Sequence, residues 1–591
     1  MTFNILAARP LWLATLTLCS AVVAHRSSGD RMMRRLLLVA SLALASGRAP
    51  WARRTTTTTA SPAAPPSGAA FVASLKAGEL RAAARIAAPA YAAWWTHLLE
   101  DAPEHVFIET VLICFLAYLF LCGRRAAKAP KLSRREVDEL VDDWEPEPLV
   151  PALSGAASEI VGRWKVVESA DDRGFVTLRG KRRSSAGLAG LFSGSEAAPT
   201  KLLNCASFDF LGMSGAREVR DAAAAALTKY GCGSCGPRGF YGSIDVHEQL
   251  EVEVAAFLGV ERAIAFSDSA SCCTSTVAAF AKRGDLLVVD DGVCEPLRTG
   301  CVLSRATVLP YKHNDAGDLE RVLAAVAADD AAKGRAPGTQ RRFVVCEAVS
   351  RDVGDVAPLD ELLRLKDAYG YRLILDESLS VGVLGSTGRG IKELFDVADP
   401  KAVEITTVDM SPAFGSLGGL CVGTEEVIDH QRLSGAGYCF SAAAPPFYSA
   451  AGLAALALVA KDPPFKRLRE NAWRLKTKLV LVFAAAKAHP KLTLVSDDAN
   501  DVPFALLKLS RPQEPGADLR ALEDLVDALI DRGFCCCVSK YDESVYGRAT
   551  KNTALPAMRP KPLALKVAVT AKHEPATVDA LVAAIVDAAG P

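Results

Sequence analysis

The chain has 591 residues, of which 50% are apolar and 23% are charged. This length exceeds that of one ordinary domain, so we expect two or three folded units. The 68 basic side chains equal the 68 acidic ones, and this neutral balance gives no reason to expect nucleic acid as a partner.

The 16 cysteines include an adjacent run at 535–537 but show no small repeated spacing. In a chain of this length the pattern favours reduced thiols over the alternative of a disulfide framework. No CxxC pair has zinc-like partners nearby and only eight histidines are present, so we expect no metal site.

Residues 1–70 are typical of a leader followed by a low-complexity linker. Two apolar stretches that end in small residues, Pro10–Ala24 and 31–47, stand in tandem, and each has the length of a targeting sequence. The tract TTTTTASPAAPP at 55–66 cannot build a core. The duplication leaves two alternatives open: a genuine targeting region, or a gene-model artefact upstream of a later initiator methionine.

A single transmembrane helix is expected at 105–123. The apolar run Val106–Cys122 follows an amphipathic, interfacial segment at 71–104, which carries Trp94 and Trp95, and basic residues come after it. Such a run has about the minimum length that spans a bilayer. The basic flank lies on the C-terminal side, which predicts a single-pass protein with its main domain in the cytosol. The alternative is a buried helix of a globular domain.

From about residue 201 the chain alternates short apolar runs with helical patterns. The expected strands are 263–266, 286–289, 343–346, 372–375 and 404–408. The expected helices are 318–328, 358–369 and one that carries the apolar stripe Leu250, Val254, Phe257 and Leu258 and stops at Gly259. This alternation predicts an α/β fold with a mostly parallel sheet that helices cover on both faces.

We therefore divide the rest of the chain into a linker and N-terminal arm at 124–200, a large domain at 201–460 and a smaller α+β C-terminal domain at 461–591. In open parallel sheets, ligands bind at the carboxyl ends of the strands. Turns that begin at Ser267, Asp376 and Ser411 follow expected strands and are predicted to meet in one crevice.

Several long motifs occur in order and resemble one enzyme family. They are YGCGSCGPRGFYGSIDVHEQLE at 230–251, KHND at 312–315, CEAVSRDVGDVAPL at 346–359 and DESLSVGVLGSTGRG at 376–390. They are similar to the α-oxoamine synthases, which are fold-type I pyridoxal-phosphate enzymes that condense an amino acid with an acyl-CoA. The resemblance implies an aminotransferase-like large domain.

Within that family, EPEPLVP at 145–151, CGPRGFYG at 235–242 and IDHQRLSGAGYCFSA at 428–442 look like the non-catalytic long-chain-base subunit one of serine palmitoyltransferase. This resemblance implies a heterodimer with the catalytic subunit two in the endoplasmic reticulum membrane, together with small regulatory membrane proteins and membrane lipids. L-serine and palmitoyl-CoA are the implied substrates. The implied cofactor is pyridoxal phosphate, held covalently by the partner and not by this chain.

Three positions of the implied cofactor site have lost their chemistry. In the stretch TTVDMSPAFGSLGGLCVG at 406–423, matching the family's loop puts Pro412 where the Schiff-base lysine stands. Proline has no amine to offer. The family's ring-stacking histidine corresponds to Cys294 and its second histidine to Leu379, so the stacking face and the acid–base group are missing too.

Other parts of the implied site are retained in part. Asp376 matches the carboxylate that meets the pyridine nitrogen; the alternative is a strand-end aspartate that caps the next turn. The expected phosphate cradle is SDSASCCT at 267–274, where Asp268 adds a repelling anion. Lys566 stands where the family holds the substrate carboxylate with arginine, and lysine lacks the bidentate fork.

The loop CGPRGFYG is expected at the dimer interface, because family active sites form between subunits. Its glycines permit unusual backbone angles, and Cys235, Arg238, Phe240 and Tyr241 are expected to offer charge and aromatic surface that completes the partner's site. The alternative is a tight loop fixed for packing alone. Two other functions stay open for the chain: an independently active homodimeric synthase with an unrecognised amine, and a purely regulatory scaffold.

Overall fold

The structure is a computed structural model that describes residues 133–142, 144, 165–179, 199–336, 338–485, 491–496, 500–512, 515–539, 558–559 and 561–590. The expected leader, interfacial segment and transmembrane helix at 105–123 lie outside these residues and stay predictions. Of the helices formed by the described part, none is both long and apolar enough to cross a membrane.

The chain divides into two compact units, Met1–Pro146 and Glu147–Pro591. In the first, the described helix is α6 (Arg134–Asp142), and the side chains at 134–139 and 141–142 lie exposed. A capping box starts it: the backbone N–H of Glu136 donates to Ser133 Oγ (3.3 Å), and the N–H of Ser133 donates to Glu136 Oε2 (2.7 Å).

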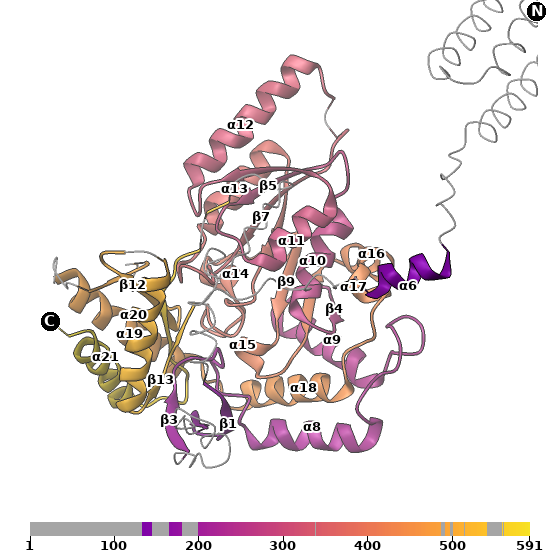
Figure 1. Cartoon of the computed structure of the whole chain (residues 1–591). Helices are drawn as coiled ribbons and strands as arrows, with labels where there is room; N and C mark the ends of the chain where they lie inside the picture. Colours follow the sequence, from indigo (N-terminus) through magenta and orange to yellow (C-terminus); the bar gives the residue numbers. More distant parts are fainter. Residues whose placement is uncertain are drawn as a thin grey trace, which may run out of the picture. The chain divides into compact units, whose positions relative to one another are not determined.

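A seven-stranded sheet forms the centre of the second unit (Figure 1). In spatial order its strands are β4 (Arg262–Phe266), β10 (Gly419–Gly423), β9 (Ile405–Asp409), β8 (Arg372–Asp376), β7 (Arg342–Glu347), β5 (Leu286–Asp290) and β6 (Thr307–Tyr311). Strand β10 runs antiparallel to both β4 and β9, and the remaining neighbours are parallel.

Helices cover both faces of this sheet, as its fully buried strands require. One face carries α8 (Arg217–Tyr230), α9 (Asp245–Leu258), α12 (Ala316–Lys333), α13 (Leu359–Tyr369) and α18 (Pro446–Lys461). The other carries α10 (Ser269–Phe280), α11 (Glu295–Ser304) and α16 (Glu425–Ser434). Three short helices lie at loop positions: α14 (Ile391–Leu394), α15 (Ser411–Phe414) and α17 (Ala436–Cys439).

The strands supply alternate side chains to the two cores. Val288 and Leu373 face the core beneath α9, α12 and α13, whereas Leu287 and Ile374 face the core beneath α10 and α11. All four side chains are fully buried. This two-sided burial explains why the strands read as continuous apolar runs in the sequence.

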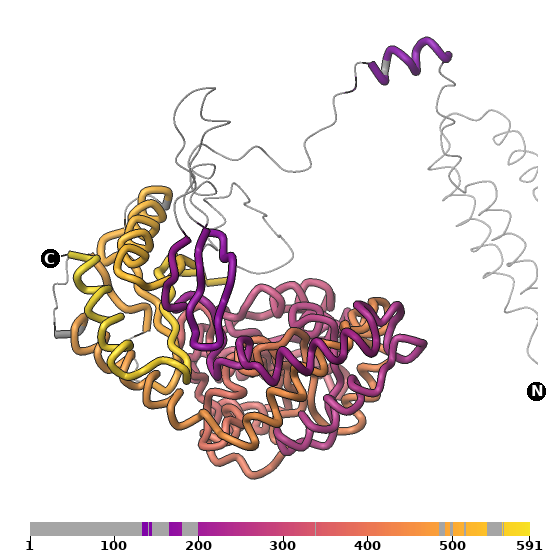
Figure 2. The backbone as a smooth tube through the Cα atoms, turned by 90° about the horizontal axis from the view of Figure 1, so that it is seen from below, coloured from indigo at the N-terminus to yellow at the C-terminus, as the bar shows by residue number. Residues whose placement is uncertain are grey.

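The remaining elements form two smaller sheets and the helices that pack on them, beside the large sheet. A four-stranded sheet contains β11 (Leu492–Leu494), β12 (Phe504–Leu509), β15 (Leu565–Ala568) and β14 (Cys537–Val538). Helices α19 (Phe465–Ala485), α20 (Pro515–Asp531) and α21 (Pro575–Ala589) share its apolar core. A further sheet joins β1 (Val167–Ala170), β2 (Phe175–Leu178), β3 (Thr200–Asn204) and β13 (Phe534–Cys535), so the N-terminal arm lies against the C-terminal segment (Figure 2).

The predicted aminotransferase-like α/β fold is confirmed. Each of the five expected strands and the expected helices is present, and Gly259 ends α9 in the left-handed region as predicted (φ 66°). The sequence reading missed β6 and β10, and because β10 is antiparallel the sheet is mixed.

Candidate functional site

The three turns predicted to meet do lie at one edge of the sheet. Strands β4, β8 and β9 all run in the same direction, and their carboxyl ends lead to Asp268, Asp376 and Ser411. Cys273 of α10 and Thr407 of β9 both contact the Asp376 carboxylate, so the elements share a single buried centre. This centre is the candidate site.

Asp376 accepts hydrogen bonds from three other residues of the site. Its Oδ2 accepts from Thr407 Oγ1 (2.7 Å), Cys273 Sγ (3.1 Å) and Ser378 Oγ (3.1 Å), and its Oδ1 accepts from the N–H of Ser378 (3.0 Å). The residue is 4% exposed. Both alternatives from the sequence fit part of this picture: the carboxylate sits at the expected place, and it caps the turn that follows β8.

Pro412 is the second residue of the short helix α15 (Ser411–Phe414), which follows β9. A proline suits the first turn of a helix, because the N–H that it lacks has no partner within the helix there. Its carbonyl accepts from the N–H of Phe210 (2.7 Å), and the next turn packs so tightly that a Cβ on Gly415 would lie 2.2 Å from the nitrogen of Ser214. The loop has therefore kept its close packing around a residue without an amine.

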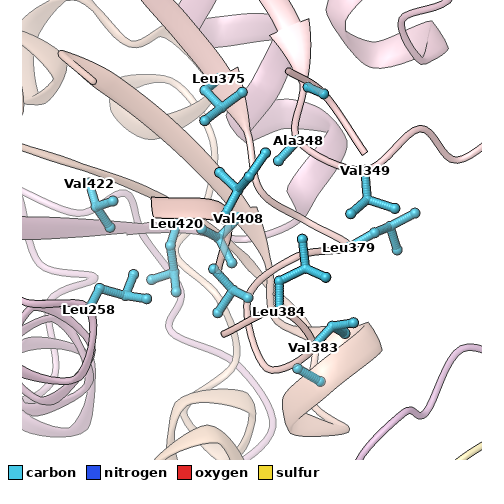
Figure 3. Packing of buried hydrophobic residues seen from close by; sticks show 14 of the residues in the cluster. Leu258, Ala348, Val349, Leu375, Leu379, Val383, Leu384, Val408, Leu420 and Val422 are labelled. Carbon is cyan, nitrogen blue, oxygen red and sulfur yellow. The ribbon is translucent and has the colours of Figure 1, made fainter. Parts of the chain in front are cut away.

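The two positions that match family histidines are both buried. Cys294 caps the start of α11, and burial, followed by the nearby Glu347 and Asp376, raises the pKa of its thiol well above the ordinary value. Leu379 is 2% exposed and lies in the apolar core with Val349 and Leu384 (Figure 3). Leu379 therefore contributes packing, and the Cys294 thiol stays protonated.

The expected phosphate cradle, the N-terminus of α10, is capped by the chain itself. Asp268 is the N-cap residue: its Oδ1 accepts from the N–H of Ser271 (2.7 Å) and its Oδ2 from Ser271 Oγ (2.7 Å). A carboxylate at this point uses the N–H group and the helix dipole that would otherwise attract an anion. An incoming phosphate would meet both competition and repulsion.

The loop 235–242 differs from expectation at one residue. Phe240 and Tyr241 are 73% and 79% exposed, as an interface role requires, whereas Arg238 is only 4% exposed and forms an ion pair with Glu251. The expectation that Arg238 offers charge at the surface is therefore wrong, because a carboxylate in the following helix draws it inward. Cys235 is exposed and has a positive φ of 57°.

Two charged residues that the sequence reading did not single out lie beside Asp376. Burial, and then the Asp376 charge, raises the pKa of Glu347 to about 8. Burial alone would lower the pKa of Arg351, but Cys294, Glu347 and Asp376 outweigh it and raise that pKa. Glu347 is the last residue of β7 and Arg351 follows it by four residues, and a position at the carboxyl end of a strand was the available signal for a site role.

A cleft opens beside this centre, between the large sheet and the C-terminal layer. Its volume is about 550 Å³, and Phe208, Arg351 and Lys566 are among the residues that line it. The ammonium of Lys566 lies 4.3 Å from the centre of the Phe208 ring, and the Arg351 guanidinium lies 5.9 Å from the same ring. Lys566 and Arg351 thus face one aromatic ring in this cleft, and the role that the resemblance implies for Lys566 stays a prediction.

The sequence also did not predict the role of His313, in the KHND motif, as a buried link between two carboxylates. Its Nδ1 lies 2.7 Å from Asp290 Oδ1 and its Nε2 lies 3.1 Å from Asp355 Oδ1. Burial alone would lower its pKa, but the two carboxylates raise that pKa to about 10. The imidazolium therefore joins β5 to the loop after β7, on the side of the site where Cys294 lies.

Residues 200–585 match the family described as Aminotransferase class I and II. Long chain base biosynthesis protein 1c of Oryza sativa subsp. japonica is 36% identical over 472 residues, which cover 79% of this chain and 88% of that protein. Serine palmitoyltransferase 1 of Dictyostelium discoideum is 37% identical over 369 residues, or 62% of this chain and 71% of that one.

Solved structures share the fold at lower identity. A serine palmitoyltransferase from Sphingomonas wittichii has a TM-score of 0.58 and 21% identity, covering 79% of this chain and 98% of that one. One from S. paucimobilis, with a bound PLP–myriocin aldimine, has a TM-score of 0.58 and 22% identity, covering 77% of this chain and 96% of that one.

Proposed function

Since this chain belongs to the aminotransferase class I and II family, among the long chain base biosynthesis protein 1 and serine palmitoyltransferase 1 chains, we propose that it is the non-catalytic subunit of serine palmitoyltransferase. In this role it supports the condensation of L-serine with palmitoyl-CoA to 3-ketodihydrosphingosine, the first step of sphingolipid synthesis. The reaction itself takes place in a catalytic partner subunit.

The observation that carries the proposal is Pro412 at the carboxyl end of β9. It stands where the family's lysine is expected, at the start of a loop that has kept its tight packing. The stretch between Lys401 and Lys461 contains no other lysine. A chain that keeps the frame of this loop without the amine is suited to a structural role in the complex.

Pyridoxal phosphate does not suit the residues of this site. The Asp376 carboxylate already accepts from Cys273, Thr407 and Ser378, so a pyridine nitrogen would have to compete with these donors. Asp268 caps the helix that would hold the phosphate. We therefore propose that the cofactor of the complex is held by the catalytic subunit and that this chain takes part in no chemical step on it.

This chain's own contribution is proposed to come from the exposed loop 235–242. Phe240 and Tyr241 project from it, while Pro237 O accepts from the N–H groups of Phe240 (3.3 Å) and Gly242 (3.1 Å) and fixes the turn. Rigid aromatic side chains supply contact area at low entropic cost, as a subunit interface requires. We propose that they border the partner's site and exclude water from it.

The membrane context is part of the same proposal. The expected transmembrane helix at 105–123 would hold the complex in the endoplasmic reticulum membrane with the large domain in the cytosol. There the chain would meet the catalytic subunit, small regulatory membrane proteins and a lipid-soluble product. Protease protection of the C-terminal domain in sealed microsomes, with loss of protection after detergent, would contradict this orientation.

The central experiment uses the purified chain and the catalytic subunit in parallel. Each is incubated with pyridoxal phosphate and reduced with borohydride, and labelled lysines are identified by mass spectrometry. The catalytic subunit is expected to carry a reduced adduct and this chain none. A stoichiometric adduct on this chain, above all on Lys566 in the cleft, would instead support an independently active synthase.

Co-expression separates the subunit role from a purely regulatory scaffold. The catalytic subunit is expected to need this chain for activity, and Tyr241→Ala in this chain is expected to lower the activity of an intact complex. Full activity of the Tyr241→Ala and Phe240→Ala complexes would favour the scaffold and contradict the in-trans role.

A further inference from the structure

Arg238 lies at the base of the exposed loop but points into the protein. Its guanidinium makes two short contacts with the Glu251 carboxylate, at 2.9 Å and 3.2 Å, and its Nε donates to Ser243 Oγ at 3.2 Å. Ser243 Oγ also accepts from the N–H of Gly239 (3.3 Å). The buried Arg238 side chain therefore links the loop to Glu251 and Ser243 on the side that faces the protein interior.

Glu251 connects Arg238 to strand β4 of the large sheet. It lies on α9, and its Oε1 also accepts from the N–H of Ala265 in β4 (2.9 Å). Burial raises the pKa of Glu251 while Arg238 opposes that shift, so the carboxylate depends on the guanidinium for its charge. If this buried ion pair were broken, each partner would be an uncompensated charge inside the protein, which is strongly destabilising. The pair therefore holds Arg238 in one position.

The same loop is fastened to the segment 436–444, which follows α16. The N–H of Ala443 donates to the carbonyl of Gly236 (2.9 Å), and Ser234 Oγ donates to the carbonyl of Ala443 (2.8 Å). The Arg238 guanidinium lies 5.8 Å from the ring centre of Tyr438. Two motifs that lie far apart in the sequence are thus held together around one buried cation.

We infer that Arg238 is a positioning residue for the reaction of the complex: its buried pair with Glu251 sets the backbone from which Phe240 and Tyr241 project toward the partner. Arg238 touches no substrate and acts through the loop. The inference rests on the proposed in-trans role of the loop. It gives a role to a charged residue that is neither exposed at the surface nor part of the candidate site around Asp376.

The test separates positioning from simple stability. Full-length chains carrying Arg238→Met, Arg238→Lys or the double change Arg238→Met with Glu251→Met are compared with wild type, alone and in complex with the catalytic subunit. The matched control is Arg262→Met, which removes an exposed ion pair of 3.0 Å with Glu425. The measurements are the thermal midpoint, hydrogen exchange of 235–242, and kcat and KM of the complex.

Arg238→Met is expected to lower the thermal midpoint, speed exchange in the loop and reduce kcat/KM at least tenfold. The double change is expected to recover the midpoint, because no buried charge is left unpaired. Loop exchange should stay fast and kcat/KM low in it, since the Nε hydrogen bond to Ser243 and the fork to Glu251 are both gone. Arg238→Lys should recover part of kcat/KM, and Arg262→Met should change none of these values.

A double variant that regains slow loop exchange and full kcat/KM together with its midpoint would overturn the inference, because the pair would then serve stability alone. Unchanged loop exchange in Arg238→Met would overturn it as well, and that readout needs no partner. A wild-type chain that adds nothing to the catalytic subunit's activity would instead contradict the proposed function.

Discussion

His313 provides a quantitative test of the structure, because it is buried between two carboxylates. Asp290 and Asp355 each accept from one ring nitrogen, at 2.7 Å and 3.1 Å, so both nitrogens carry protons and the ring is an imidazolium. Its side chain is only 7% exposed. The change His313→Gln leaves at least one buried carboxylate without a cationic partner.

The magnitude follows from the pKa of His313, which is raised from 6.5 to about 10 in the folded protein. A difference of that size corresponds to roughly 4–5 kcal/mol of stability by linkage, and breaking a buried pair typically costs about 3–5 kcal/mol. Because the folded pKa is the higher one, this contribution is complete below about pH 6.5 and is lost as pH rises through 10.

The assay is urea unfolding of the full chain, followed by circular dichroism at several values of pH from 6 to 10.5. Wild type is expected to lose stability progressively between about pH 6.5 and 10, and His313→Gln is expected to start lower and change less. His430→Gln is the control, since the ring of His430 contacts the neutral carbonyl of Ala279 and the Phe280 ring, and the described residues show no ion pair to it. Equal pH dependence of wild type and His313→Gln would refute the reasoning.

Three further changes test other parts of the structure. Pro412→Lys should not give a borohydride-reducible adduct, because Asp268 and Asp376 keep their present partners; an adduct would show that the lysine alone was missing. Gly242→Ala would place a Cβ 1.8 Å from the carbonyl oxygen of Gly236, so it should abolish activation of the catalytic subunit, and wild-type activation would contradict the loop geometry. Burial lowers the pKa of His573 to about 4, so stability should fall as pH drops from about 6.5 to 4, and His573→Leu should remove that part of the pH dependence in urea unfolding.

The sequence predicted the elements whose side chains are buried on both sides of the sheet. Strands β5, β7 and β8 are continuous apolar runs bounded by polar residues, and helices alternate with them. Two strands were not predicted because their own residues are unusual in strands. Strand β10 begins and ends with glycine, and β6 contains Pro310 at the sheet edge. Their residues resemble turns, and only pairing with a neighbour makes them strands.

The site was predictable as a list of positions but not as a set of contacts. Matching motifs located Pro412, Cys294 and Leu379, since each is a change of residue type at a recognisable place. The direction of Arg238 depends on Glu251, which lies 13 residues away on a helix. Two of the partners of Asp376 are more distant still, since Thr407 is 31 residues away and Cys273 is 103 residues away. Such contacts are set by tertiary packing, which no local pattern records.

Helix α10 combines two separate roles at different points along its length. Its first residues carry the Asp268 cap, which opposes phosphate binding. Further along the same helix, Ser275 Oγ accepts from the N–H of Gly437 (2.8 Å), and Thr276 Oγ1 accepts from Gln431 Nε2 (2.9 Å). These contacts hold the segment to which the exposed loop is fastened. Because the two tasks lie at different points of one rigid helix, changes at its N-terminus leave the support of the interface loop intact.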